Sequence, residues 1–219
     1  MEGEAPHTGT TIVAVTYPGG VVIGADSRVS TGNYVSNRAS NKIAQLSDTV
    51  FLLRSGSAAD TQAVGDYVRY FLEQHEGELQ RPSRVSTAAS LARALNYENK
   101  QLIGAMIVAG WDEAGGGQAW AIPIGGTLSR QPWATDGSGS TYIWGYLDEA
   151  WREGLSQAEA EKVVVEALSL AMARDGSSGG VVRTVTIDAS GAEKKLHTPE
   201  THYRTWDEMP EPRLALGAR

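Results

Sequence analysis

Along the chain, the spacing of apolar residues alternates between a strand pattern and a helix pattern, and this order restricts the fold more than any other feature. Runs of β-branched residues on both sides of a turn at 17–20 predict an N-terminal β-hairpin. Helical spacing begins after residue 57, stops at Pro82, resumes, and returns in the last third of the chain. Strands are expected at 10–16, 21–25, 42–46, 49–53, 105–111, 119–124, 131–135, 181–187 and 193–197, and the clearest helices at 59–79, 88–95 and 156–173.

The elements therefore run as strands, two helices, strands, two helices and strands. Strands grouped in hairpins and helices grouped in pairs predict antiparallel sheets covered by helices, which is an α+β class. A doubly wound parallel fold would alternate single strands with single helices. Ser86 or Thr87 is expected to cap the second helix, and Ser156 with Glu159 forms a capping box at the last. Neither an internal repeat nor a low-complexity linker is found, so we expect one domain.

Charge and residue content exclude several classes of function. The net charge of −7 is spread along the chain, whereas a nucleic-acid binder normally shows a basic stripe. The chain has no cysteine, which excludes disulfides, thiolate catalysis and cysteine-ligated zinc. The histidines have no metal-ligand spacing, so we expect all of them to face solvent and expect no histidine-based triad. They are His7, His75, His197 and His202.

The N-terminal residues 1–9 are short, polar and acidic, without the basic and apolar regions of a secretory signal. No apolar run approaches the ~20 residues of a membrane-spanning helix. We therefore expect an intracellular protein that does not contact a membrane.

Thr10, which follows Gly9 at the start of the first expected strand, is a candidate nucleophile. A threonine hydroxyl needs a base, and the α-amino group of a chain-terminal threonine, whose ordinary pKa is about 7.7–8.0, can be that base. A preceding glycine would let the hydroxyl attack the preceding carbonyl and so release that amine. Strand propensity alone also explains two threonines in a row.

Five further segments could take part in chemistry, although each has an ordinary structural explanation. Asp26 follows a strand, where aspartate usually caps a turn, and a lysine such as Lys42 at a strand start is usually a solvated charge. The small residues within 54–60 allow close backbone approach and present N–H groups at a helix start, or they simply let Ser57 cap the helix. Glycine- and serine-rich segments that resemble turns lie at 137–140 and 174–180.

In this order and at these intervals, the segments strongly resemble the β subunits of the eukaryotic 20S proteasome, and most of all the β1 type, which has caspase-like activity. The resemblance implies a four-layer αββα sandwich of two antiparallel sheets flanked by helix pairs, the N-terminal nucleophile hydrolase fold. It implies a short propeptide at 1–9, this domain at 10–198 and a C-terminal arm at 199–219. The segments that carry it are 9–11, 24–28, Lys42, 54–60, 109–112, 137–140, 142–146 and 174–180.

The resemblance also implies the roles of individual residues. Thr10, freed by cleavage after Gly9, is the nucleophile, and its own amine is the general base. The Lys42 ammonium favours the alkoxide, and Asp26 holds Lys42 in place. The backbone N–H of Gly56 is the oxyanion donor. The residues that match the cluster ordering the amine and a water are Ser138, Asp175 and Ser178.

Arg54 occupies the position of a basic residue at the base of the β1-type pocket for the side chain before the scissile bond. An arginine there would pair with a carboxylate, which predicts cleavage after Glu or Asp. Alternatively, Arg54 pairs with an acidic residue of a neighbouring subunit. The other substrate-binding residues that the resemblance implies are Val29, Ser30 and Ala58.

As a whole, the resemblance implies a threonine endopeptidase that hydrolyses unfolded, ubiquitin-tagged proteins inside a four-ring barrel of α and β subunits, in the cytoplasm and nucleus. It implies no metal, nucleotide or organic cofactor, and no nucleic-acid partner. With residues 1–9 attached, Thr10 has no free amine, and the chain is expected to be an inactive precursor.

Asp136 departs from the pattern, because subunits of this type commonly have glycine there. Its carboxylate is expected either to disturb the supporting cluster or to pair with a basic neighbour. A catalytically silent ring subunit is the main alternative function, although such subunits typically lack the threonine or its lysine. An N-terminal nucleophile hydrolase acting on small amides is a further alternative, and a non-enzymatic binding module has no positive support.

Overall fold

The computed structural model describes residues 9–99 and 104–199. Within these ranges, one five-stranded sheet has the order β10-β1-β2-β11-β12, and each pair of neighbours is antiparallel. The N-terminal hairpin predicted from the sequence forms its centre. The strands are β1 (Ile12–Tyr17), β2 (Gly20–Ala25), β10 (Trp133–Asp136), β11 (Val182–Asp188) and β12 (Gly191–His197).

A second five-stranded antiparallel sheet has the order β5-β6-β7-β8-β9. Its strands are β5 (Ile43–Gln45), β6 (Val50–Gly56), β7 (Gly104–Asp112), β8 (Gly116–Ile122) and β9 (Ser129–Gln131). A separate hairpin of β3 (Val29–Thr31) and β4 (Tyr34–Asn37) lies in the polar stretch where no strand was predicted. All four residues of β4 are exposed, so the hairpin has no buried apolar face that could leave a sequence pattern.

The expected strand at 131–135 is in fact two strands that belong to different sheets. β9 is an edge strand of the second sheet, β10 is an edge strand of the first, and Pro132 lies between them. A proline cannot donate a ladder hydrogen bond, which suits the point where the chain passes from one sheet to the other. The Pro132 carbonyl accepts a hydrogen bond from the backbone N–H of Thr16 at 2.9 Å.

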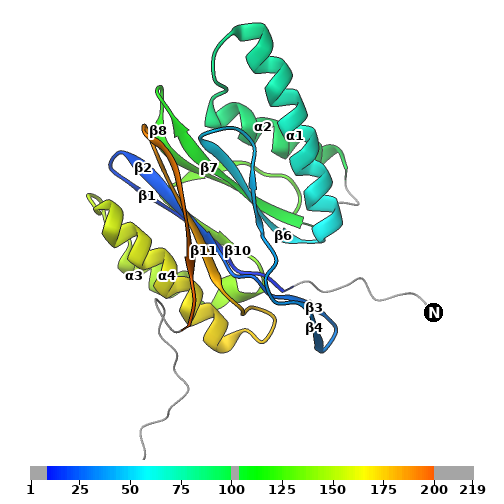
Figure 1. Ribbon diagram of the computed structural model, residues 1–219, viewed down its shortest axis with the longest axis vertical. Coiled ribbons are helices and arrows are strands. Elements are labelled where there is room, and N and C mark those ends of the chain that lie inside the picture. Colours follow the sequence, from blue (N-terminus) through cyan, green and yellow to red (C-terminus); the bar gives the residue numbers. More distant parts are fainter. Residues whose placement is uncertain (1–8, 100–103, 200–219) are drawn as a thin grey trace, which may run out of the picture.

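The helices form two groups on opposite sides of the sheets (Figure 1). α1 and α2 pack on β6 and β7, and α4 packs on β1, β2 and β11 with α3 beside it. The described helices are α1 (Ala58–Leu79), α2 (Val85–Glu98), the short 3-10 helix η1 (Ser138–Tyr142), α3 (Trp144–Ala150) and α4 (Gln157–Arg174).

Helix capping follows the sequence at two of the three predicted ends. Ser57 caps α1, and Ser156 with Glu159 forms the expected capping box at α4. The prediction of a Ser86 or Thr87 cap for α2 is wrong. α2 begins at Val85, two residues before the start that a Ser86 cap would give, and the Asp112 carboxylate at the end of β7 accepts the Val85 backbone N–H at 2.8 Å.

Three apolar clusters hold the sheets and helices together. One lies between the two sheets and includes Ile12, Phe51 and Ile107. A second joins the first sheet to α3 and α4 through residues such as Val13, and a third joins the second sheet to α1 and α2. Each sheet is covered by the other sheet on one face and by helices on the other. Successive side chains of a strand point to opposite faces, so the central strands bury apolar residues at nearly every position. The predicted α+β class with antiparallel sheets is confirmed.

His197 differs from the solvent-facing position expected for every histidine. It is 5% exposed, and its Nε2 lies 2.8 Å from the Thr184 hydroxyl on the paired strand. His7 and His202, the leader 1–8 and the arm from 200 to 219 lie outside the described residues.

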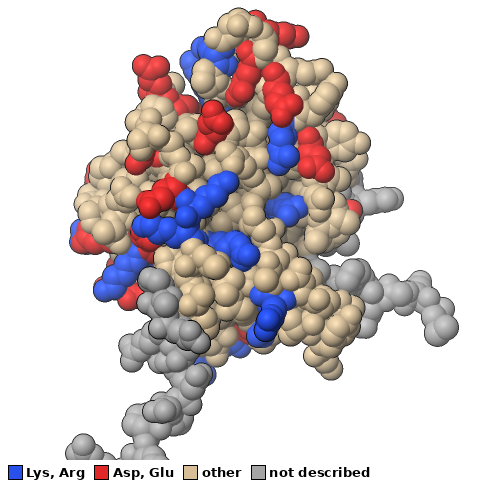
Figure 2. All heavy atoms as spheres, in the orientation of Figure 1, with Lys and Arg blue, Asp and Glu red and all other residues tan. Residues whose placement is uncertain are grey.

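Acidic and basic side chains are interspersed on the face shown in Figure 2. No helix in the described part of the chain is both long enough and apolar enough to cross a bilayer.

Candidate active site

Thr10 lies two residues before β1 and is buried, with 3% of its surface exposed. Its hydroxyl donates to the Gly9 carbonyl at 2.7 Å, and its backbone N–H donates to the Ser138 hydroxyl at 3.1 Å. The Thr10 carbonyl accepts from the Gly139 N–H at 3.2 Å. With residue 9 attached, the Thr10 nitrogen is an amide and has no lone pair with which to act as a base.

Gly9 is confined by the backbone of Ser177. A Cβ atom added to Gly9 would lie 1.9 Å from the Ser177 Cβ and 2.4 Å from the Ser177 carbonyl oxygen. Neither distance is compatible with a side chain, so only glycine fits without a shift of the chain around Ser177. The glycine that the sequence suggested on chemical grounds is therefore also required by the space around the Gly9–Thr10 bond.

Lys42 directly precedes β5 and reaches across to the first sheet. Its ammonium donates to Asp26 Oδ1 at 2.7 Å and to the Gly9 carbonyl at 2.9 Å, and the two side chains of the ion pair are 7% and 0% exposed. Burial lowers the pKa of Lys42 below its ordinary value, and the Asp26 carboxylate opposes this shift. The site thus holds an ammonium group against the carbonyl that Thr10 would attack.

Asp26 follows β2, and four hydrogen bonds fix its carboxylate. Oδ1 accepts from the Thr11 N–H at 2.9 Å in addition to Lys42. Oδ2 accepts from the N–H groups of Arg28 and Gly179, both at 3.1 Å. These backbone donors stabilise the buried anion independently of the lysine.

Ser138, Asp175 and Ser178 lie together, as the resemblance implied. Asp175 is the C-cap residue of α4, and its Oδ2 accepts from the Ser138 hydroxyl at 2.7 Å and from the Ser178 hydroxyl at 2.6 Å. The Ser178 oxygen also lies 2.8 Å from the Thr11 hydroxyl. Because the single Ser178 proton is used on Asp175, Thr11 is the donor in that contact. Thr11 is thus a member of the cluster that the sequence did not single out.

Gly56 ends β6 with a φ of 87°, a conformation that favours glycine, and α1 begins two residues later. Arg54, two residues before it, donates to the Asn41 carbonyl at 3.2 Å. Burial lowers the pKa of Arg54 and the charge of Asp66 opposes this, but an arginine stays protonated. No carboxylate among residues 9–99 and 104–199 lies within 4.0 Å of the Arg54 guanidinium.

The other implied pocket residues lie in separate elements. Val29 and Ser30 belong to β3, and Ala58 is the exposed first residue of α1. In the described ranges no hydrogen bond joins any of these three residues to Arg54.

Asp136 does neither of the two things expected of it. Its Oδ1 accepts from the Ser55 hydroxyl at 3.0 Å and from the Gly137 N–H at 2.6 Å. It does not contact the Ser138–Asp175 pair, and it forms no ion pair with a basic residue of the described chain. The sequence offered no signal for Ser55, because the two residues are 81 positions apart.

The assembled site places a hydroxyl and a fixed ammonium both within hydrogen-bond distance of the Gly9 carbonyl. That arrangement suits acyl transfer, in which negative charge develops on a carbonyl oxygen. Across the described ranges no three His, Asp or Glu side chains converge as metal ligands would.

Comparison with known proteins identifies the family. The family model for proteasome subunits matches residues 6–187. The chain is 53% identical over 215 residues to proteasome subunit beta type-6 of Arabidopsis thaliana, which covers 97% of this chain and 92% of the relative. It is 50% identical over 205 residues to beta type-6 of Dictyostelium discoideum, with coverages of 93% and 96%. Human proteasome subunit beta type-9 is 48% identical over 191 residues, with 87% of each chain covered.

The family match includes Thr10, Lys42, Arg54 and the segments that form the supporting cluster. The relatives span nearly the whole chain and are all named as β subunits. The chain therefore belongs to the proteasome subunit family, as a β subunit of the multi-subunit core built from α and β rings.

Proposed function

We propose that this chain is a catalytic β1-type, caspase-like subunit, a threonine endopeptidase that becomes active when Gly9–Thr10 is cut. One observation carries the proposal. The buried Lys42 ammonium contacts both Asp26 and the Gly9 carbonyl, directly beside the Thr10 hydroxyl. A merely structural subunit has no need for a buried charge pair at that carbonyl, since burying two charges carries a desolvation cost.

The first reaction is release of the N-terminus. The Thr10 Oγ1 attacks the Gly9 carbonyl carbon, a C–O bond forms, and Lys42 donates to the oxygen on which negative charge develops. The C–N bond then breaks, and the hydroxyl proton ends on the released amine. Water hydrolyses the resulting ester, which leaves Thr10 as the first residue.

Substrate hydrolysis would use the same hydroxyl. The new amine replaces the amide that now donates to Ser138, so its hydrogen-bond partner is already in place. Ser138 is in turn held by Asp175. The amine accepts the Thr10 proton as the hydroxyl attacks the peptide carbonyl, and it passes this proton to the leaving amine as the peptide C–N bond breaks. Water then hydrolyses the ester and regenerates the hydroxyl. We assign the backbone N–H of Gly56 as the oxyanion donor.

Arg54 supports a preference for cleavage after acidic residues. Its guanidinium is partly buried, and no carboxylate of the described chain lies at ion-pair distance. A substrate Glu or Asp side chain would supply that counter-charge in the fork geometry that arginine favours. We assign Val29, Ser30 and Ala58 to the same substrate pocket.

For the chain as a whole, we propose the four-layer αββα arrangement of N-terminal nucleophile hydrolases over residues 10–198. Residues 1–9 would be the propeptide, and 199–219 an arm toward neighbouring subunits. The substrates would be unfolded, ubiquitin-tagged polypeptides, degraded in the cytoplasm and nucleus.

The second candidate is a catalytically silent ring subunit. Its support is that the family match and the named relatives establish a ring subunit without establishing a reaction. The names of the relatives give a subunit type and no activity.

The intact mass of this chain, isolated from assembled particles, separates the two candidates. A chain that begins at Thr10 is expected, whereas a chain that keeps Met1 to Gly9 supports the silent subunit. The Lys42→Met variant should retain residues 1–9. Arg152→Met is the control and should be cleaved normally, because the ion pair of Arg152 with Glu159 is exposed. Reporter peptides with Glu, Leu or Arg before the scissile bond then test the Arg54 pocket. Equal turnover of all three peptides would contradict the proposed preference for acidic residues.

A further inference from the structure

The candidate catalytic residues belong to two different sheets, so their relative positions depend on how the sheets are held together. Thr10, Asp26 and Ser138 are attached to strands of the first sheet, whereas Gly56 ends β6 of the second and Lys42 precedes β5. The core between the sheets is apolar. Apolar burial is non-directional, so it fixes the spacing of the sheets better than their exact register.

A polar contact crosses from one sheet to the other beside Thr10. The Ser55 hydroxyl on β6 lies 3.0 Å from Asp136 Oδ1 at the end of β10 and 3.1 Å from the Ala105 carbonyl of β7, so its proton is shared between two acceptors. The same Asp136 oxygen accepts the Gly137 N–H. Ser55 directly precedes Gly56, and Gly137 directly precedes Ser138. The Asp136 carboxylate therefore links the strand end that carries the proposed oxyanion donor to the segment that orders the Thr10 nitrogen.

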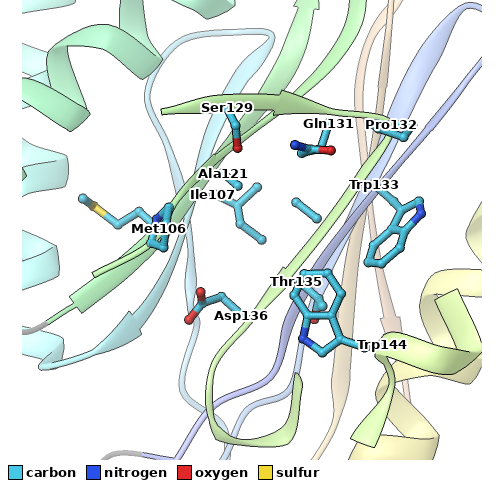
Figure 3. Close-up of a pocket in the computed structure, with 12 residues that line it drawn as sticks. Met106, Ile107, Ala121, Ser129, Gln131, Pro132, Trp133, Thr135, Asp136 and Trp144 are labelled. Carbon is cyan, nitrogen blue, oxygen red and sulfur yellow. The ribbon is translucent and has the colours of Figure 1, made fainter. Parts of the chain in front are cut away.

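A cavity borders this contact. A cavity of about 360 Å³ lies between β10 and the strands β7, β8 and β9, and Asp136 is part of its wall together with Met106, Ile107, Trp133 and Trp144. Figure 3 shows the Asp136 carboxylate on the Met106 side of the cavity, away from Trp144. β10 also lies close to β7 and β8, and the Ser55–Asp136 hydrogen bond is the contact that joins its end to β6.

We propose that Asp136 is a positioning residue, which acts through Ser55 to hold the Gly56 N–H at a fixed distance from the Thr10 hydroxyl. The inference rests on the proposed function. Asp136 forms hydrogen bonds with Ser55 and Gly137 and none with Thr10 in the described chain. Its effect should therefore appear in the transition state, where the oxyanion donor acts, and little in substrate binding.

The test uses assembled particles in which the variant chain is the sole copy of this subunit, with kcat and KM measured on a peptide with Glu before the reporter. Asp136→Ala and Ser55→Ala should each lower kcat by about ten- to a hundredfold with KM nearly unchanged, as expected for a misplaced oxyanion donor. Asp136→Asn should recover most of the activity, since its amide oxygen still accepts from Ser55. Asp148→Ala, an exposed aspartate on α3, is the matched control with unchanged kcat.

A double-mutant cycle adds a readout that a purely structural role would not reproduce. If the two residues act as one link, the double alanine variant should be no slower than the slower single variant. Additive losses, a change in KM alone, or a lower melting temperature with kcat unchanged would each overturn the positioning role while leaving the proposed function intact. A parent chain that retains Met1 to Gly9 and turns over no peptide would overturn the proposed function and this inference with it.

Discussion

The buried pair of Lys42 and Asp26 should respond unequally to loss of its two members. Lys42→Met removes the ammonium, but Asp26 keeps three backbone N–H donors. Breaking a buried ion pair typically costs about 3–5 kcal/mol, and these donors place Lys42→Met near the low end, at about 3 kcal/mol.

Asp26→Ala leaves more groups without a partner. The buried ammonium keeps only the Gly9 carbonyl as an acceptor, and the same three backbone N–H groups lose theirs. Each unpaired buried donor costs about 1–3 kcal/mol, so the total loss should reach about 6 kcal/mol. A loss of that size is comparable to the whole stability of many domains, about 5–15 kcal/mol.

Urea unfolding of the full chain, followed by tryptophan fluorescence, measures both losses as changes in the free energy of unfolding. Arg152→Met is the control, because its ion pair with Glu159 is exposed on both sides, at 61% and 45%, and should contribute under about 1 kcal/mol. Equal losses for the two variants, or a larger loss for Lys42→Met, would show that the backbone donors do not hold the carboxylate once the lysine is gone.

Further predictions concern the scissile bond, pH, substrate choice and a helix cap. Gly9→Ala should block or greatly slow release of Thr10, because the new Cβ collides with Ser177, and the intact mass of the chain reports the result. Because folding lowers the pKa of Lys42, the unfolded chain binds more protons between that lowered value and the ordinary 10.5, so the free energy of unfolding should rise with pH across this window. Urea titrations at several pH values should show the rise in the parent chain and a flatter profile in Lys42→Met. Arg54→Met should raise KM for a peptide with Glu before the reporter and leave a Leu peptide unaffected, and parallel changes for both peptides would argue against the pocket. Ser156→Ala should lower the free energy of unfolding by about 1 kcal/mol through loss of the α4 cap, measured by thermal unfolding.

Local sequence patterns predicted those elements whose own residues carry the apolar spacing or the capping residue. The N-terminal hairpin, the long helix α1 and the Ser156 capping box are visible in apolar spacing and capping residues. The β3–β4 hairpin was missed because its second strand is exposed throughout and has no apolar alternation. The cap of α2 was assigned to the wrong residue because the real partner, Asp112, lies 27 positions away on β7.

The same holds for the candidate site: residues within recognisable motifs were predicted, and residues whose partners lie far along the chain were not. Thr10, Asp26 and Lys42 could be proposed because the motifs around them resemble a known family, and the structure brings all three together. Thr11 and Ser55 could not, since their partners are 167 and 81 positions away and an isolated Thr or Ser gives no hint of its partner. Contacts of that range depend on how the sheets dock, which no short segment encodes.

The position of the candidate site between two sheets has a consequence for the folding of the chain. A polypeptide whose sheets have formed but not yet closed on each other keeps Thr10 on one half and Lys42 on the other. If the proposed function holds, such a molecule lacks the charge beside its hydroxyl, and peptidase activity would follow only after the two sheets have docked. Under the proposed function, docking of the two sheets would then control when the chain can first cleave another protein.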